Sequence, residues 1–450
     1  MHPYGTVLLR GFGGNGLYFR DALDRLGITV HGFQAGKYKT AIEPLTRNAP
    51  SAEAIEADQA WLNDLWSTWT AEVERVRELP SGAINQMIDA APERLAAAQG
   101  DPAQFALNEK LIDGLKTRDE FRAMMTERGA PGDGDEGTFR QIGFDAYLGH
   151  VPARRGDAVG VIVAQGEIVD DEGPQGLVGG RVTAELVRRA REDERIKAVV
   201  LRIDSPGGSV FGSELIRREV ELTRAAGKPV VASMGDVAAS GGYWIATSAD
   251  VIVADPATIT GSIGVFGVLP TFERSLEKLS IGTGGAATTW LAGAADTLRP
   301  LDKRLAAMLE SNIGHLYQRF VSQVAASRQT TPDRIHKVAQ GRVWTGAQAK
   351  THGLVDELGG YQQALAAAAQ RASLSSDSPV VYFEREPRGI ERWLSLLVSD
   401  LAARLKTEFG LMLPAGLSPL QPTLSREFAV FRDSAADPLR GYAYCFCRPG

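Results

Sequence analysis

Residues 196–208 read Ile-Lys-Ala-Val-Val-Leu-Arg-Ile-Asp-Ser-Pro-Gly-Gly, an apolar run that enters a turn with two glycines. The run at 196–203 has the length and β-branched content of a buried strand. Segments of the same kind alternate with helical patterns on both sides of it. We expect strands at 160–168, 196–203, 230–233 and 250–254, and helices at 182–191, 211–226 and 241–248. This alternation predicts an α/β fold with mostly parallel strands joined by helical crossovers.

A serine follows a neighbouring strand in the run Val-Ala-Ala-Ser-Gly-Gly-Tyr-Trp, where it is Ser240. The carboxyl ends of parallel strands meet at one edge of a sheet, so we expect Ser240 to lie near Gly207 and Gly208. A backbone amide of Gly207 or Gly208, together with that of Gly241, would then stabilise an anionic tetrahedral intermediate. A phosphate-binding loop is excluded because no Gly-Lys-Ser/Thr follows. The pattern predicts a nucleophilic serine.

No histidine is an obvious base for the deprotonation of Ser240. None of the six histidines has the sequence setting of a catalytic base, and most lie in polar stretches: His2, His31, His150, His315, His336 and His352. A lysine can serve where burial lowers its pKa enough to leave a neutral amine. The run at 36–44, Gly-Lys-Tyr-Lys-Thr-Ala-Ile-Glu-Pro, offers Lys37 and Lys39, which would share one face of a strand because they are two residues apart. From the residues alone, the choice between them stays open, as does the alternative that both are simply solvated.

The chain also resembles itself at a separation of about 250 residues. Apolar residues spaced three and four apart recur with a nearly constant offset, which predicts a tandem duplication of helical segments. The matching sets are Phe19, Leu23, Leu26 and Ile28 with Phe272, Leu276, Leu279 and Ile281, then Leu62, Leu65, Trp66 and Trp69 with Ile313, Leu316, Tyr317 and Phe320, and finally 111–115 with 354–358. The candidate lysines belong to the first copy and Ser240 to the second. The second copy has no ionisable group at the equivalent position, 290–293.

These patterns predict four parts of the chain. We expect a partial first repeat at 1–128, a linker at 129–156, a complete second repeat at 157–375 and a tail at 376–450. Residues 157–253 have no counterpart in the first copy, so we expect the first repeat to lack an N-terminal half. The alternative is a natural architecture of one and a half repeats.

Composition narrows the function classes. The 450 residues carry a net charge of -6, and no basic cluster with interleaved aromatic residues occurs, which argues against nucleic-acid binding. The sequence contains no run of about 18 apolar residues, which is the length that predicts a membrane-spanning helix. The stretch 393–413 has an amphipathic helical pattern, typical of a packed helix or of interfacial membrane contact. Two cysteines, Cys445 and Cys447, have no further ligand residues nearby, and we expect no metal and no cofactor.

The motifs around Ser240, Gly207 and Lys39, together with Thr-Gly-Ser-Ile-Gly-Val-Phe-Gly at 260–267, resemble the signal peptide peptidase A family in its long, duplicated form, also called protease IV. The similarity extends over residues 3–375. It implies tandem repeats with a crotonase/Clp protease-like fold, and a serine endopeptidase with a Ser/Lys dyad that degrades cleaved signal peptides or similar apolar peptides.

The resemblance also implies a role for each motif residue. Ser240 would be the nucleophile, Lys39 the general base, and Ser262 the group that orients the lysine amine. The oxyanion would be surrounded by Gly207, Gly208 and Gly241.

Further expectations follow from the same family. The resemblance implies a homo-oligomer, specifically a tetramer. It also implies association with the bacterial inner membrane at its periplasmic face. The expected partners are peptide substrates, and no nucleic acid is expected. Long members begin with a membrane anchor and a complete first domain, so the chain is expected to be N-terminally truncated.

Two alternatives remain at this stage. A crotonase-type enzyme acting on acyl-thioesters would need acid/base carboxylates near Gly208, where the sequence offers only Glu214. A truncated chain could also be a non-catalytic scaffold that binds peptides or oligomerises.

Overall fold

The computed structural model describes residues 1–132, 139–150, 155–172, 176–385 and 442–445. The chain forms two compact units. Of the described residues, one unit comprises those within 1–14 and 62–150, and the other those within 15–61 and 155–445.

The larger unit contains an eight-stranded sheet with a mostly parallel core. Its strands are β2 (Ala158–Gln165), β5 (Ile196–Ser205), β7 (Val230–Ala239), β8 (Val251–Ala254), β9 (Ile259–Gly261), β11 (Val343–Thr345), β12 (Glu357–Leu358) and β13 (Val380–Phe383). The main path runs β11-β9-β7-β5-β2-β13, and only the β11–β9 pair is antiparallel. The predicted α/β fold with mostly parallel strands is therefore confirmed.

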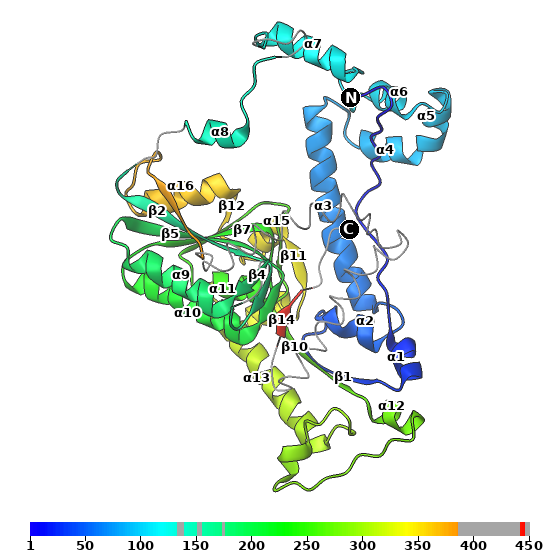
Figure 1. Cartoon of the computed structure of the whole chain (residues 1–450), viewed down its shortest axis with the longest axis vertical. Helices are drawn as coiled ribbons and strands as arrows, with labels where there is room; N and C mark the ends of the chain where they lie inside the picture. Colours follow the sequence, from blue (N-terminus) through cyan, green and yellow to red (C-terminus); the bar gives the residue numbers. More distant parts are fainter. Residues whose placement is uncertain (133–138, 151–154, 173–175, 386–441, 446–450) are drawn as a thin grey trace, which may run out of the picture. The chain divides into compact units, whose positions relative to one another are not determined.

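Alternate residues of the central strands pack on opposite faces of this sheet. In β5, Val199 and Leu201 join a core with the helices α9 (Gly180–Glu192), α10 (Val210–Ala225) and α11 (Gly241–Ala246). The intervening Val200 faces the other way, into a smaller cluster with α16 (Tyr361–Arg371). Figure 1 shows these helices beside the central strands. A strand buried on both faces requires the continuous apolar run seen in the sequence.

Two strand boundaries differ from the prediction by three residues or more. The strand expected at 160–168 ends at Gln165 because Gly166 turns the backbone with a φ of +103°, and a new strand, β3 (Glu167–Val169), begins after it. The strand expected at 230–233 continues as β7 to Ala239, directly before Ser240.

A second, six-stranded sheet joins the two copies of the duplication. Its order is β1 (Thr29–Ala35), β10 (Val265–Thr271), β14 (Tyr442–Tyr444), β6 (Gly207–Ser209), β3 and β4 (Leu177–Gly179). Strand β1 belongs to the first copy and pairs antiparallel with β10 of the second over its full length, from Thr29↔Thr271 to Ala35↔Val265. This pairing is visible in Figure 1.

The helices reproduce the predicted repeat. Helices α3 (Ala52–Val76) and α13 (Lys303–Ser327) each have 25 residues and begin at the offset of 251 found in the sequence. Phe19 and Phe272, which are 253 residues apart, are the N-caps of α1 (Arg20–Leu26) and α12 (Glu273–Lys278). The four-part division of the chain stays a prediction, and the amphipathic stretch 393–413 lies outside the described residues.

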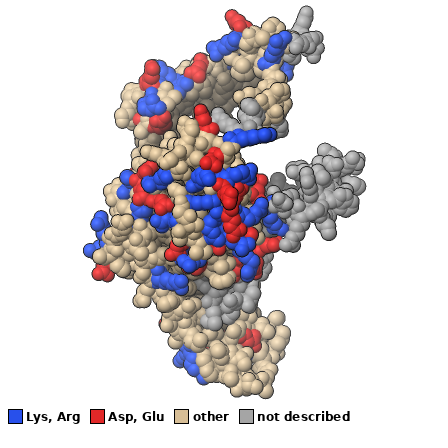
Figure 2. Space-filling view, turned by 90° about the vertical axis from the view of Figure 1, so that its left-hand side faces the viewer, with Lys and Arg blue, Asp and Glu red and all other residues tan. Residues whose placement is uncertain are grey.

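The remaining helices are short. In the larger unit they are the 3₁₀ helices η1 (Thr40–Ile42) and η2 (Trp290–Gly293) and the α-helices α2 (Glu43–Thr46), α14 (Pro332–Val338) and α15 (Gly346–Thr351). The smaller unit contains α4 (Ala83–Asp89), α5 (Ala91–Ala97), α6 (Pro102–Asn108), α7 (Arg118–Arg128) and α8 (Phe144–Leu148). Among the helices that the structure describes, none has the length and hydropathy needed to span a membrane. Figure 2 shows acidic and basic side chains interspersed on one face rather than gathered into a patch of one sign.

The contact between α9 and α10 provides a test of the packing. A Cβ added at Gly180 would lie 2.5 Å from the Cα of Gly212, so we expect Gly180→Ala to lower the free energy of unfolding by about 1–3 kcal/mol. Gly314 is a matched control, because it lies inside α13 with nothing within 4 Å of an added Cβ. Gly314→Ala should instead stabilise by up to about 1 kcal/mol. Calorimetric melting of both variants measures the difference, and equal effects would contradict close helix packing at Gly180.

Candidate active site

Ser240 lies at a strained turn between a strand and a helix. It follows the last residue of β7 and is the N-cap of α11, with φ +57° and ψ −113°. A left-handed φ is uncommon for a residue with a side chain and persists only where the surroundings impose it. The Ser240 N–H donates to the Gly261 carbonyl at 2.9 Å, and its carbonyl accepts from the Trp244 N–H at 2.8 Å. This backbone geometry holds the side chain at the carboxyl edge of the sheet.

Lys39 lies beside Ser240 although the two are 201 residues apart. The Nζ of Lys39 is 2.7 Å from the Oγ of Ser240, and both residues are essentially inaccessible to solvent. Lys39 follows β1 in a turn closed by its own N–H, which donates to the Gly36 carbonyl. The pairing of β1 with β10 thus brings the amine of the first copy to the hydroxyl of the second within a single chain.

Lys37, the other candidate base, is exposed, and its Nζ lies 4.7 Å from the centre of the Tyr38 ring. Sequence reasoning had placed both lysines on one face of a strand. That reasoning was wrong, because β1 ends at Ala35 and the two lysines lie in a turn where alternate residues need not share a face.

Burial holds the pKa of the Lys39 amine well below its ordinary value. The neighbouring polar atoms fit a neutral amine. Besides Ser240, Nζ lies 3.0 Å from both the carbonyl oxygen and the Oγ of Ser262. A neutral amine has two hydrogens and one lone pair, so it can donate to both oxygens of Ser262 and accept the Ser240 hydroxyl proton. The arrangement can therefore take a proton from Ser240.

Ser262 is held from two sides. It follows β9, which pairs with β7 up to Ala239↔Gly261, and it has a φ of +50°. Its N–H donates to the carbonyl of Arg342 at 2.7 Å. The turn that carries Ser240 and the turn that carries Ser262 are therefore extensions of adjacent strands.

One segment that the sequence analysis missed connects the lysine turn to Ser262. The carbonyl of Gln340 accepts from the Tyr38 N–H at 2.8 Å, and the Gly341 N–H donates to the carbonyl of Ile263 at 2.8 Å. The side chain of Arg342 continues this link, since its Nη1 lies 3.1 Å from the Tyr38 hydroxyl and 2.8 Å from Glu56. No sequence pattern identifies these residues, because their function is to fix the relative positions of two distant turns.

The glycines predicted to surround an oxyanion do come together. A Cβ at Gly207 would lie 2.7 Å from the Gly241 nitrogen, and one at Gly241 would lie 3.1 Å from the Gly207 Cα, so the two backbones approach too closely for side chains. The Gly207 N–H donates to Ser205 Oγ at 3.2 Å. Gly208, in β6, is next to this contact. The amides of Gly208 and Gly241 are thus the better candidates for oxyanion donors.

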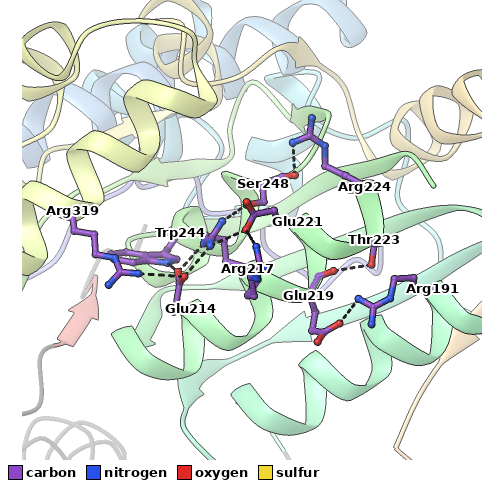
Figure 3. Close-up of polar contacts among 11 residues, drawn as sticks. Arg191, Glu214, Arg217, Glu219, Glu221, Thr223, Arg224, Trp244, Ser248 and Arg319 are labelled. Carbon is purple, nitrogen blue, oxygen red and sulfur yellow. Dashed lines mark hydrogen bonds and ion pairs between the residues drawn. The ribbon is translucent and has the colours of Figure 1, made fainter. Parts of the chain in front are cut away.

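Helix α11, which begins directly after Ser240, is contacted through Trp244 by a polar cluster (Figure 3). Glu214 accepts from Trp244 Nε1 at 2.9 Å and from Arg217 Nε at 2.7 Å. Arg217 also donates to Ser248 Oγ at 2.7 Å, and Arg319 approaches Glu214 at 3.7 Å. Burial alone would raise the pKa of Glu214, but the bonds from Arg217 and Trp244 hold it below its usual value. Glu214 is therefore an ionised structural carboxylate, not the acid/base group that a thioester enzyme would need.

In the described part of the chain, the histidines and the residues that could bind a metal do not form a second candidate functional site. His31 Nε2 is 3.0 Å from Thr271 Oγ1, and His336 Nδ1 is 2.8 Å from the Tyr317 hydroxyl. Within residues 1–385, apart from the short undescribed gaps, and 442–445, no three His, Cys, Asp or Glu side chains are grouped as a metal site would require.

Comparison with known proteins gives concordant results. The model of "Peptidase family S49" matches residues 1–130 and 223–375. "Protease 4" of Salmonella typhi is 40% identical over 448 residues, which are 99% of this chain and 71% of that protein. "Serine protease SPPA, chloroplastic" of Arabidopsis thaliana is 34% identical over 400 residues, 85% of this chain and 56% of that protein. Among solved structures, the "1510-N membrane-bound stomatin-specific protease S97A mutant" has 12% identity and a TM-score of 0.32, covering 52% of this chain and all of that one.

The burial of Lys39 predicts a pH-dependent stability. The folded-state pKa is lowered, so between it and the unfolded value near ~10.4 the unfolded chain binds one more proton, and stability rises with pH by up to about 1.4 kcal/mol per unit. Lys39→Met removes this dependence while keeping a similar volume. The stability of Lys39→Met relative to the parent should therefore fall as pH rises from roughly 8 to 10.

Urea unfolding of both proteins across this pH range measures the difference. Lys37→Met is the matched control and should follow the parent at every pH, because Lys37 is exposed. If the free energy of unfolding of Lys39→Met changed with pH in parallel with that of the parent, the lowered pKa of Lys39 would be contradicted.

Proposed function

The chain belongs to peptidase family S49 and is a serine protease, and we propose that it cleaves peptide bonds with Ser240 as the nucleophile and Lys39 as the general base. The observation that carries this proposal is the 2.7 Å contact between Lys39 Nζ and Ser240 Oγ in a site from which water is excluded. A lysine can accept a proton only as the neutral amine, a form that burial makes available by lowering the pKa, and Lys39 is fully buried.

In the proposed reaction, the neutral amine of Lys39 accepts the Ser240 proton as Oγ attacks the scissile carbonyl. The resulting oxyanion accepts hydrogen bonds from the amides of Gly208 and Gly241, a contribution that is large because the donors are fixed in advance. The Lys39 ammonium then protonates the leaving amine, and water, deprotonated by the same lysine, hydrolyses the acyl-enzyme. Ser262 keeps the amine oriented through both steps.

We propose that the substrates are cleaved signal peptides or similar apolar peptides, met at the periplasmic face of a bacterial inner membrane. The motif resemblance supports this substrate class, and the amphipathic pattern at 393–413 supports membrane contact. Assembly into a homo-oligomer, a tetramer by the same resemblance, belongs to this proposal.

Substitutions of the two central residues test the mechanism. Ser240→Ala and Lys39→Ala should each lower kcat/KM for a fluorogenic peptide by at least about 10³-fold, because members of a catalytic unit act together. Lys37→Ala is the control and should retain parental activity, since its amine is exposed and away from Ser240. Loss of activity in Lys37→Ala with retention in Lys39→Ala would contradict the base assignment. A parental chain that neither cleaves peptides nor reacts with serine-directed probes would favour a non-catalytic scaffold.

Ser262→Ala tests the orienting role separately. It removes one of the two acceptors of Lys39 but leaves the Ser262 carbonyl in place, so kcat should fall about 10-fold to 100-fold rather than vanish. A hydrogen bond to the ammonium favours the charged form, so its loss should lower the pKa of Lys39 and shift the acid limb of the pH profile to lower pH. Ser67→Ala on the exposed side of α3 is the control. An unshifted acid limb would show that Ser262 does not contact the base during catalysis.

A further inference from the structure

A segment from the end of the chain lies in the same sheet as the catalytic glycines. Strand β14 pairs antiparallel with β6 on one side, from Tyr442↔Ser209 to Tyr444↔Gly207, and with β10 on the other at Phe266↔Tyr442. The next residue, Cys445, is disulfide-bonded and donates its N–H to the Pro206 carbonyl at 2.7 Å. Many domains bind peptides as an extended segment that pairs with the edge of a strand.

The register of β14 places one of its carbonyl groups at the proposed oxyanion site. Ala443 is paired with Gly208, and a Cβ at Gly241 would lie 3.0 Å from the Ala443 carbonyl oxygen. A Cβ at Gly207 would also clash with this oxygen. The Ala443 carbonyl therefore lies among the three glycines that are expected to bind the carbonyl of a substrate.

The side chains of β14 fill two different pockets. Tyr442 is buried in an apolar cluster with Ile42 and Leu45, and its ring stacks on Phe266 with centroids 6.0 Å apart. Ala443 is fully buried in the main core. The groove thus accommodates a large apolar residue followed by a small one.

Burial of the catalytic pair gives an independent reason to regard β14 as an occupant. Ser240 has an exposed fraction of 0% and Lys39 of 1%, so part of the chain has to move before a peptide can reach the nucleophile. The site would open if a segment that pairs antiparallel with the glycines, and lies against them, moved away. Strand β14 has both properties.

We propose that Tyr442–Cys445 is a tethered substrate mimic that occupies the peptide groove and has to leave before a peptide can bind, an inference that rests on the proposed function because it assigns the groove to substrate. It also defines the preferred peptide. The preferred peptide is an extended segment in which a large apolar residue is followed by a small residue. The carbonyl of the small residue lies at Ser240, and the peptide bond that this carbonyl forms with the next residue would be cleaved.

The test measures peptide binding to the full chain carrying Ser240→Ala, which cannot cleave either the probe or its own tail. The probe is a fluorescein-labelled peptide, Arg-Gly-Tyr-Ala-Tyr-Ser, that copies residues 440–445 with Ser in place of Cys445, and anisotropy reports binding. If β14 covers the groove about nine tenths of the time, the apparent affinity of the probe is about tenfold below that of the open groove.

Two substitutions in β14 should release the groove. Ala443→Pro removes an N–H from a strand that is paired on both sides, and Tyr442→Ala empties the apolar pocket. Each, added to Ser240→Ala, should bind the probe about tenfold more tightly. Tyr382→Ala in β13 is the matched control for loss of a tyrosine from a strand, and it should leave binding unchanged.

Unchanged or weaker probe binding in both β14 variants would overturn the proposal and make β14 a permanent strand of the sheet. If Ala443→Pro melts at a much lower temperature than its parent, Tyr442→Ala decides alone. Binding to Ser240→Ala requires no turnover, so failure of the Ser/Lys mechanism would appear in the activity of the Lys39 variants and not in this measurement.

Discussion

The contact between the Lys39 amine and the Ser240 hydroxyl is the constraint on which the rest of the structure depends. It requires an amine to be buried, which costs free energy unless the amine is neutral and its hydrogens are bonded. The two side chains come from different copies of a duplication, so the register of β1 on β10 has to be fixed over seven paired residues. A slip of one residue would shift the lysine turn by about 3.3 Å and reverse the faces of β1.

Backbone strain at the site is compensated by hydrogen bonds to neighbouring strands. Ser240 and Ser262 both have a left-handed φ, and each donates its N–H to a carbonyl of an adjacent segment. Those segments are consecutive in the sheet, since Ser240 extends β7, Ser262 extends β9 and Arg342 precedes β11. Such conformations persist where the surroundings determine them completely. The parallel sheet therefore serves to hold two strained turns at hydrogen-bonding distance from one amine.

Sequence patterns predicted the central sheet because each of its strands is a continuous apolar run, and they predicted Ser240, Gly207 and Gly241 because parallel strands present their carboxyl ends together. The choice of Lys39 over Lys37 came from family resemblance, and the strand geometry invoked for the two lysines was wrong. Arg342 and β14 had no local signal, since their positions depend on pairings with residues far away in the chain. Long-range register is the part of a fold that local pattern determines least.

The six-stranded sheet brings three segments that are distant in the chain to one place: the lysine turn after β1, the glycines of β6 and the strand β14. Each supplies something the others lack, namely an amine, a set of amides and an extended backbone that lies against those amides. A chain in which either copy of the duplication is unfolded has no complete catalytic pair, so the activity proposed here depends on the folding of both. When β14 is in place, its Ala443 carbonyl occupies the position among the glycines that the substrate carbonyl is proposed to take. Folding alone would then yield a closed site, and peptide binding would have to compete with an intramolecular strand, which favours extended peptides that match its apolar and small pockets over the surface loops of folded proteins.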